Sequence, residues 1–281
     1  MKEFGKRIYV TFTATMILAI FFFVSDTPLG RLFVLAFLTA LGLVSLYEYG
    51  EFVRKKEVHL SRRLLFSFGF VSIVGSYLCA TGKVNAAFLG DLALLYLLAL
   101  FYLRRKKQEG GIAYFALACF PFFYIVFPIS LVFFLLYSPY FQGSWWFFYL
   151  VAVTKITDIA AYLAGRLFGR RPLCPKISPK KTYEGAVAGF LGALICSLAF
   201  AYFTDRFPVE GFVLSYQKAL ILGIVLAVLS QLGDLFESFL KRDANMKDSN
   251  KIPGVGGALD LLDSLLFTTP VLFSILYGIV G

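Results

Sequence analysis

The sequence contains a single histidine and four cysteines, and this scarcity excludes several kinds of catalytic site. His59 lies in a basic stretch away from the acidic residues, so neither a histidine-based triad nor a zinc site is expected. Cys79, Cys119, Cys174 and Cys196 have no paired or metal-type spacing. Three of them lie in apolar runs and only Cys174 lies in a loop, so we expect four reduced, space-filling side chains.

Charged residues are also scarce. Only 16% of the 281 residues are charged and 59% are hydrophobic, a balance that excludes a soluble globular protein. The apolar runs are nearly continuous and about twenty residues long, which is the length that crosses a bilayer. The sequence therefore predicts an all-α, polytopic integral membrane protein without a separate soluble domain.

About nine transmembrane helices are expected, and no internal repeat or flexible linker interrupts them. The expected spans are residues 8–25, 31–49, 63–80, 84–103, 112–137, 145–168, 183–204, 217–240 and 259–280. The first follows a basic stretch without a small-residue cleavage pattern after it, so we interpret it as an uncleaved helix rather than a signal peptide. The fifth contains Pro121 and Pro128, which predict a kink or break.

The distribution of lysine and arginine predicts the orientation. The loops on one side, with the residues that flank them, carry 22 of the 27 Lys and Arg residues, and the opposite loops carry 4. By the positive-inside rule, we expect the N-terminus to lie in the cytoplasm. The expected membrane is the inner cell membrane. The loops 165–182 and 241–258 lie on the same side, where nucleotides are present. The basic loops of this side explain why the net charge is as high as +10, so no nucleic-acid partner is expected.

Ionisable residues inside apolar spans are concentrated in the second half of the chain. Residues 1–144 carry few of them beyond Glu48 and Asp91. We expect this part to support the fold, contact lipid or form an oligomer, and we interpret Glu48 as a helix-end residue at the membrane interface. Residues 145–281 are expected to form the catalytic transmembrane part, because an ionisable group at membrane depth usually marks a working site.

Two acidic stripes are the main signal in that part. The first consists of Ser230, Asp234, Glu237 and Lys241, and the second of Asp260, Asp263 and Ser264. Their spacings of three and four residues place each stripe on one face of a helix. Carboxylate oxygens are the ligands that Mg²⁺ prefers, so Asp234, Asp260 and Asp263 are predicted to hold Mg²⁺, with room for a second cation. The alternative is a set of salt bridges to Lys241, Arg242 and Lys247 without a metal.

Three further motifs surround these stripes. Lys155, Asp158, Tyr162 and Arg166 share one helix face and predict a third polar wall of the site, or else a Lys155–Asp158 pair that neutralises itself in the membrane. The loop ending Ser178-Pro179-Lys180-Lys181-Thr182-Tyr183-Glu184-Gly185 places lysines before a helix start, as a phosphate site or a lipid-headgroup patch would. The stretch Pro253-Gly254-Val255-Gly256-Gly257 predicts a helix start whose bare amides face an anion.

These residues resemble the phosphatidate cytidylyltransferase (CDP-diacylglycerol synthase) family over about residues 145–270. The family pattern has the form S-x-x-K-R-x-x-x-x-K-D-S, then proline-glycine and H-G-G, then D-R-x-D-S. The matching residues are Ser238, Lys241, Arg242, Lys247, Asp248, Ser249, Pro253, Gly254, Gly256, Gly257, Asp260, Asp263 and Ser264. The chain departs from the pattern at Val255, where the family has histidine, and at Leu261, where it has arginine. Lys180, Lys181 or Lys251 is expected to supply the charge of that arginine.

The resemblance implies transfer of CMP from CTP to phosphatidate, which gives CDP-diacylglycerol and pyrophosphate at a cytoplasmic site. It implies catalytic roles for Asp234, Lys241, Lys247, Asp248, Asp260 and Asp263. It implies substrate contacts for Asp158, Tyr162, Arg166, Ser178, Lys180, Lys181, Thr182, Glu184, Glu237, Ser238, Arg242, Ser249, Gly254, Gly256, Gly257 and Ser264. It also implies Mg²⁺ as cofactor and a homodimer.

Three other functions remain open from the sequence. The first is another CTP-dependent membrane enzyme of the CDP-archaeol synthase or polyprenol kinase type. The second is a catalytically silent relative, and the third is a cation transporter that uses the intramembrane carboxylates.

Overall fold

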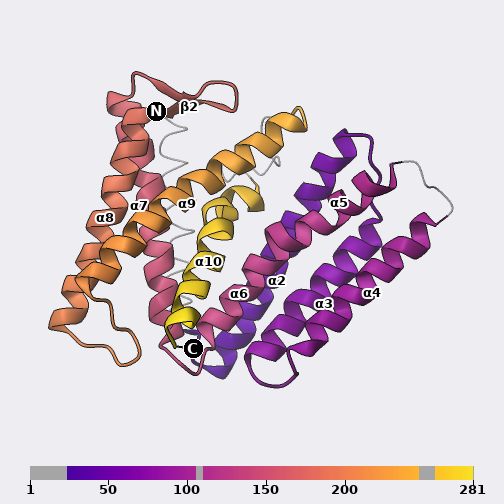
Figure 1. Cartoon of the computed structure of the whole chain (residues 1–281), viewed down its shortest axis with the longest axis horizontal. Helices are drawn as coiled ribbons and strands as arrows, with labels where there is room; N and C mark the ends of the chain where they lie inside the picture. The colour runs from indigo at the N-terminus through magenta and orange to yellow at the C-terminus, as the bar shows by residue number, and fades with distance from the viewer. Residues whose placement is uncertain (1–23, 106–109, 247–256, 281) are drawn as a thin grey trace.

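The computed structural model describes residues 24–105, 110–246 and 257–280 as a bundle of long helices with one small hairpin (Figure 1). The helices are α2 (Pro28–Lys55), α3 (Arg62–Ala80), α4 (Ala87–Arg104), α5 (Gly111–Pro121), η1 (Phe122–Val126), α6 (Phe127–Leu136), α7 (Gly143–Phe168), α8 (Tyr183–Arg206), α9 (Tyr216–Asp243) and α10 (Ala258–Val280). Strands β1 (Pro172–Cys174) and β2 (Ser178–Thr182) pair antiparallel.

Eight helical segments in the described residues are long and apolar enough to cross a membrane, with α5, η1 and α6 forming one of them. The predicted all-α, polytopic membrane class is confirmed. The first expected span, residues 8–25, lies almost wholly outside the described residues, so the count of nine stays a prediction. The orientation, with the N-terminus in the cytoplasm, also stays a prediction.

Local sequence explains several of the helix ends. The Thr27 hydroxyl accepts a hydrogen bond from the Gly30 amide at 3.0 Å, and Pro28 occupies the first turn of α2, where its missing N–H costs nothing. The irregularity expected in the fifth span is present. A π-helical turn, Phe122–Val126, follows Pro121 directly, because proline cannot donate the regular helical hydrogen bond.

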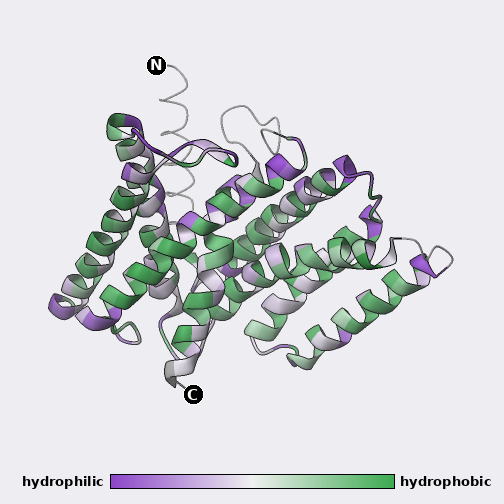
Figure 2. Cartoon of the chain, turned by 45° about the horizontal axis from the view of Figure 1, so that its top comes forward, coloured by the Kyte–Doolittle hydropathy of each residue, from purple (hydrophilic) through white to green (hydrophobic). Residues whose placement is uncertain are grey.

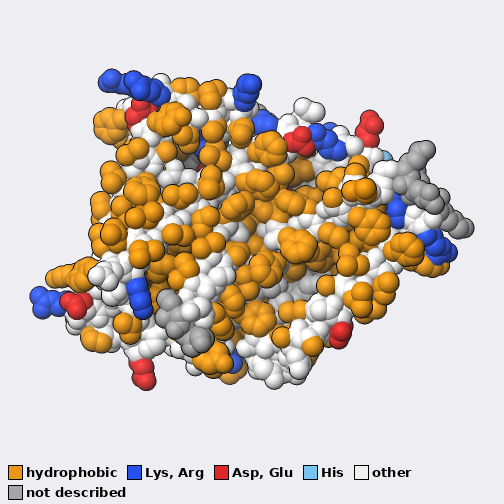
Figure 3. All heavy atoms as spheres, viewed as in Figure 1, with side chains coloured by type: hydrophobic (Ala, Val, Ile, Leu, Met, Phe, Trp, Pro, Cys, Tyr) orange, Lys and Arg blue, Asp and Glu red, His pale blue; other side chains and the backbone are white. Residues whose placement is uncertain are grey.

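The exterior of the bundle suits a bilayer. On the face shown in Figure 3, hydrophobic side chains cover the middle and charged side chains gather toward the two ends. The same separation follows the ribbon in Figure 2. Leu94 and Phe101 of α4 and Leu191 and Ile195 of α8 are among the exposed apolar side chains. Such a continuous apolar surface is expected of a membrane protein and not of a soluble one.

Helix α10 lies at the centre of the fold. It packs against α9 and α7, and also against α2 and α6 from the first half of the chain (Figure 1). Glycine permits the closest of these contacts, since a Cβ at Gly233 of α9 would fall on the backbone of Asp263 and Ser264 in α10. Small residues at a helix crossing allow two backbones to approach in this way. The proposed boundary between residues 144 and 145 remains a prediction.

Candidate active site

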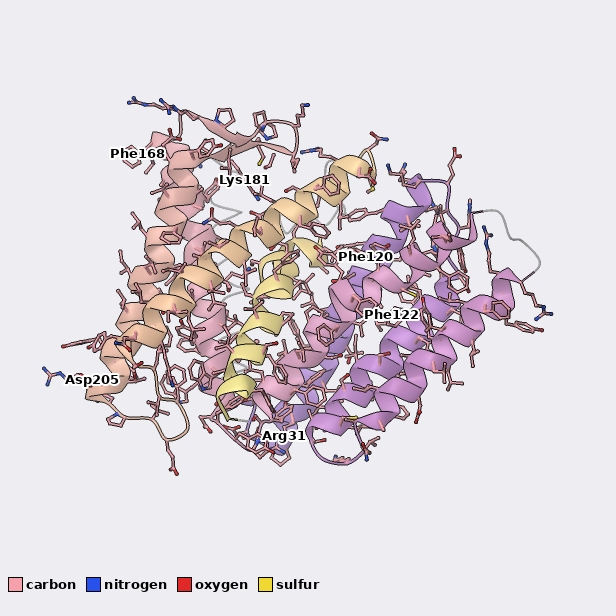
Figure 4. All side chains as sticks on the ribbon, in the orientation of Figure 1. Arg31, Phe120, Phe122, Phe168, Lys181 and Asp205 are labelled. Carbon is pink, nitrogen blue, oxygen red and sulfur yellow. The ribbon has the colours of Figure 1, made fainter. Side chains whose placement is uncertain are left out.

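The site is built where α7, α9 and α10 meet, at the end of the bundle that carries the β1–β2 hairpin. Figure 4 places Lys181 and Phe168 toward this end and Arg31 and Asp205 toward the opposite one. Acidic side chains from all three helices take part, and most of them already contact a lysine or a hydroxyl. They form two neighbouring groups.

The first group is centred on Asp158 of α7. Its two carboxylate oxygens accept hydrogen bonds from the hydroxyls of Ser230 at 3.1 Å and Ser264 at 3.3 Å, one from α9 and one from α10. The Lys155 ammonium lies 3.6 Å from the same carboxylate. Asp158 therefore pairs with Lys155, as one interpretation of this motif expected, and also joins the two acidic stripes. The role of the motif as a wall of the site stays a prediction.

Asp263 lies beside this group and is only 7% exposed. One of its carboxylate oxygens accepts the Ser264 amide at 2.6 Å. Among the described residues, no lysine or arginine nitrogen lies within 4 Å of it, although the acids Asp158 and Asp234 and the Lys155 ammonium all lie within electrostatic reach. A buried carboxylate that faces two others and has no cation in direct contact is costly unless something positive joins it.

The second group is an ion triad. The Lys241 ammonium lies 2.6 Å from the Glu237 carboxylate and also contacts Asp260, so one cation from α9 holds an acid from each of two helices. Glu237 is 1% exposed, and its second oxygen has no hydrogen-bond partner within the described part of the chain. Asp234 belongs to neither group, since it pairs with Lys181 of β2 at 2.7 Å.

The hairpin forms the basic side of the site. The Thr182 hydroxyl caps α8 by accepting the Gly185 amide at 3.1 Å. Glu184 accepts the amides of Arg170 and Arg171, at 3.1 and 3.3 Å, and so fixes the hairpin rather than reaching the acids. The Arg242 guanidinium of α9 donates to the carbonyl of Ile177 at 3.1 Å and ties the helix to the hairpin turn.

The remaining predicted residues are less central. Tyr162 and Arg166 are exposed, with 3.4 Å between the Tyr162 hydroxyl and the Arg166 guanidinium, and Lys180 is exposed on β2. Ser178 and Ser238 are half-buried at the edges. Five predicted residues, Lys247, Asp248, Ser249, Gly254 and Gly256, lie outside the described residues. So do Val255 and Lys251.

The glycine-rich helix start differs from the expectation. The amides of Ala258 and Leu259 donate to the two oxygens of Glu48, each at 2.9 Å, and the Gly257 amide donates to Asp260 at 2.6 Å. The expectation that these amides stand bare for an anion is therefore wrong for these three groups, because carboxylates of the protein itself already satisfy them. Glu48 was expected at a helix end, but α2 continues past it to Lys55 and its side chain is fully buried in the protein; its place at the membrane interface stays a prediction.

Sequence reasoning missed further contacts. The Lys155 ammonium of α7 donates to the carbonyl of Leu261, the residue that stands where the family pattern has arginine, at 3.3 Å. Lys181, one of the lysines expected to supply the charge of that arginine, pairs with Asp234 instead. Tyr124 of η1 was also missed. Its hydroxyl is buried, has no hydrogen-bond partner in the described residues, and lies within electrostatic reach of Glu237 and Asp263. An acid inside an apolar span was a usable signal for Glu48, but nothing in the sequence distinguished Tyr124.

The fold and site thus define a polytopic membrane protein with a cluster of acids and lysines under a basic hairpin. A model of the cytidylyltransferase family matches residues 5–279. The phosphatidate cytidylyltransferase of Chlamydia pneumoniae is 33% identical over 286 residues, covering 95% of this chain and 90% of that protein. Those of Chlamydia trachomatis and Staphylococcus saprophyticus are 34% and 31% identical, over 85% and 92% of this chain and 81% and 96% of theirs. The chain belongs to the cytidylyltransferase family, and the resemblance drawn from its motifs is confirmed.

Proposed function

We propose that this chain transfers CMP from CTP to phosphatidate and releases pyrophosphate. The observation that carries the proposal is the meeting of acids from three membrane helices beneath a lysine-bearing hairpin, in a chain that matches its family from end to end. The cation-transporter alternative is disfavoured, because the carboxylates cluster beside basic groups instead of being dispersed along the bundle.

The donor set partly fits a divalent cation. Asp263 is buried with no described cation within 4 Å, and one oxygen of Glu237 is buried without a partner in the described residues, so both could accept a positive ligand. In contrast, Asp260 is satisfied by Lys241 and the Gly257 amide. As the described side chains stand, no three acidic, histidine or cysteine groups form a ready metal site. Asp234 is more exposed than Asp260 and, among the described residues, is held by Lys181 alone, which is free to turn to the triphosphate. We propose that Asp263 and Asp234 hold Mg²⁺, with substrate phosphates and water as further ligands.

The residues of the chain divide the remaining work. Lys180 and Lys181 neutralise the triphosphate from the hairpin, and Lys241 fixes Glu237 and Asp260. When bound, Mg²⁺ would supply positive charge to the phosphate oxygens as charge develops on them. Because phosphatidate is already anionic, its oxygen needs no general base to attack the α-phosphorus of CTP. A new oxygen–phosphorus bond forms, the α–β bridge breaks, and pyrophosphate leaves with the electron pair.

We also propose that the hairpin end of the bundle faces the cytoplasm, in the inner cell membrane. The excess of Lys and Arg in the loops that share this end supports that orientation. It gives the site access to CTP, while the apolar flanks of the helices give it access to a lipid substrate.

The test is CMP transfer by the purified protein from labelled CTP to phosphatidate in the presence of Mg²⁺. Asp263→Asn removes the charge of the buried carboxylate and is expected to lower kcat by about 10²-fold or more. The matched control is Asp91→Asn, which removes an exposed acid of α4 and should leave the rate unchanged. Equal rates for the two variants would contradict the proposal. Transfer to a polyprenol or an archaeal-type ether lipid in place of phosphatidate would favour the alternative lipid enzymes.

A further inference from the structure

Glu48 is a buried acid that lies far along the chain from the acidic stripes of α9 and α10. It lies in α2, within the first half of the chain, and its side chain is 0% exposed. Both carboxylate oxygens accept a backbone hydrogen bond from α10, one from Ala258 and one from Leu259, each at 2.9 Å. The donor and acceptor residues are 210 and 211 positions apart in the chain.

This contact satisfies the first turn of α10 in an unusual way. The first amides of a helix have no partner within the helix, and the positive end of the helix dipole favours a negative charge there. In α2, α8 and α9 the cap is local, supplied by Thr27, Thr182 and Ser215 immediately before the helix. In α10 the negative charge at these amides comes instead from another membrane helix.

The capped turn carries Asp260, and the next turn of α10 carries Asp263. Asp260 follows Ala258 by two positions and Asp263 follows it by five. The same stretch is held from another side, because the Lys155 ammonium of α7 donates to the Leu261 carbonyl at 3.3 Å. The position and rotation of the start of α10 decide where the two acids point, so a contact that fixes this helix start also orients the acids.

We propose that Glu48 is a positioning residue of the active site. It fixes the start of α10 so that Asp260 and Asp263 face the lysines and the other acids, and it denies the two amides to a phosphate. This inference rests on the proposed function only in assuming that the acids hold Mg²⁺ for CMP transfer. The contact itself can be measured without substrate.

The first experiment follows hydrogen exchange of the backbone amides in the purified protein, without substrate. In Glu48→Ala, the segment 257–262 is expected to exchange about tenfold faster, because each amide loses a charge-assisted hydrogen bond. Glu48→Gln keeps an acceptor oxygen and should recover part of the protection. The matched control is Glu51→Gln, one turn further along α2, whose carboxylate pairs with Arg62 at 2.5 Å instead. It should exchange as the unaltered protein does.

The second experiment measures binding of Mg²⁺ alone by calorimetry. A residue that orients metal-holding side chains usually costs about 10- to 100-fold in affinity when it is removed, so the Kd for Mg²⁺ should rise by that factor in Glu48→Ala and by less in Glu48→Gln. A purely structural cap would change the melting temperature and the exchange but leave this Kd unaltered.

The outcomes separate this inference from the proposed function. Unchanged exchange in Glu48→Ala would overturn the contact, and faster exchange with an unchanged Mg²⁺ affinity would overturn the positioning role. A protein that shows both expected changes but transfers no CMP would refute the proposed function and leave the role of Glu48 intact.

Discussion

Gly233→Ala is expected to damage the site without touching any charged group. In the interior of a helix, replacing glycine by alanine ordinarily stabilises by about 1 kcal/mol. Here the added Cβ would collide with the carbonyl of Asp263, and it would lie 3.1 Å from its carbonyl carbon and 3.2 Å from the Cα of Ser264. These are backbone atoms and cannot turn aside, so α9 and α10 must separate.

The magnitude follows from two opposing effects. Overpacking of this kind costs about 1–3 kcal/mol against a gain of about 1 kcal/mol in helix propensity, which leaves a net loss of up to roughly 2 kcal/mol. Separation of the helices also moves Asp234 away from Asp263, and a displacement of about 1 Å at a reacting centre can cost about 10²-fold in rate. We therefore expect a lower Tm and a larger fall in kcat than the loss of stability alone would cause.

The assay compares thermal unfolding and CMP transfer for Gly233→Ala and a matched control. Gly90→Ala makes the same change in α4, where an added Cβ would meet no atom within 4 Å. This control should be as stable as the unaltered protein or slightly more so, with full activity. If the two variants behave alike, the close crossing of α9 and α10 at Gly233 does not hold, and the reasoning fails.

Two further predictions concern stability. Lys241→Met leaves two carboxylates of the triad without their cation and should lower the free energy of unfolding by about 3–5 kcal/mol. The control Lys56→Met breaks only an exposed pair with Asp243 and should cost at most about 1 kcal/mol. Thermal unfolding measures both, and equal losses would argue against a buried triad. Thr182→Ala removes the side-chain cap of α8 and should cost about 1 kcal/mol. Ser61→Ala should cost almost nothing, because Ser61 precedes α3 without capping it, and a Tm shift as large as that of Thr182→Ala would contradict this account.

Much of this protein could be predicted from local sequence. Apolar runs of bilayer length determined the membrane class, since their hydropathy needs no partner to be interpreted. The spacing of Asp234 and Glu237, and of Asp260 and Asp263, determined which side chains share a helix face, because helix periodicity is a local property. The motifs around these acids also determined the family.

The tertiary structure alone decided which charges meet. The sequence predicted bare amides at the start of α10, but packing brings Glu48 from α2 onto two of them. Packing also pairs Asp234 with Lys181 and Asp260 with Lys241, and it buries Asp263 with no described cation within 4 Å. Periodicity fixes the face on which a residue lies, whereas the partner depends on how helices distant in sequence pack. For that reason the residue pattern identified the acids, and only the packed bundle showed which residue each of them contacts.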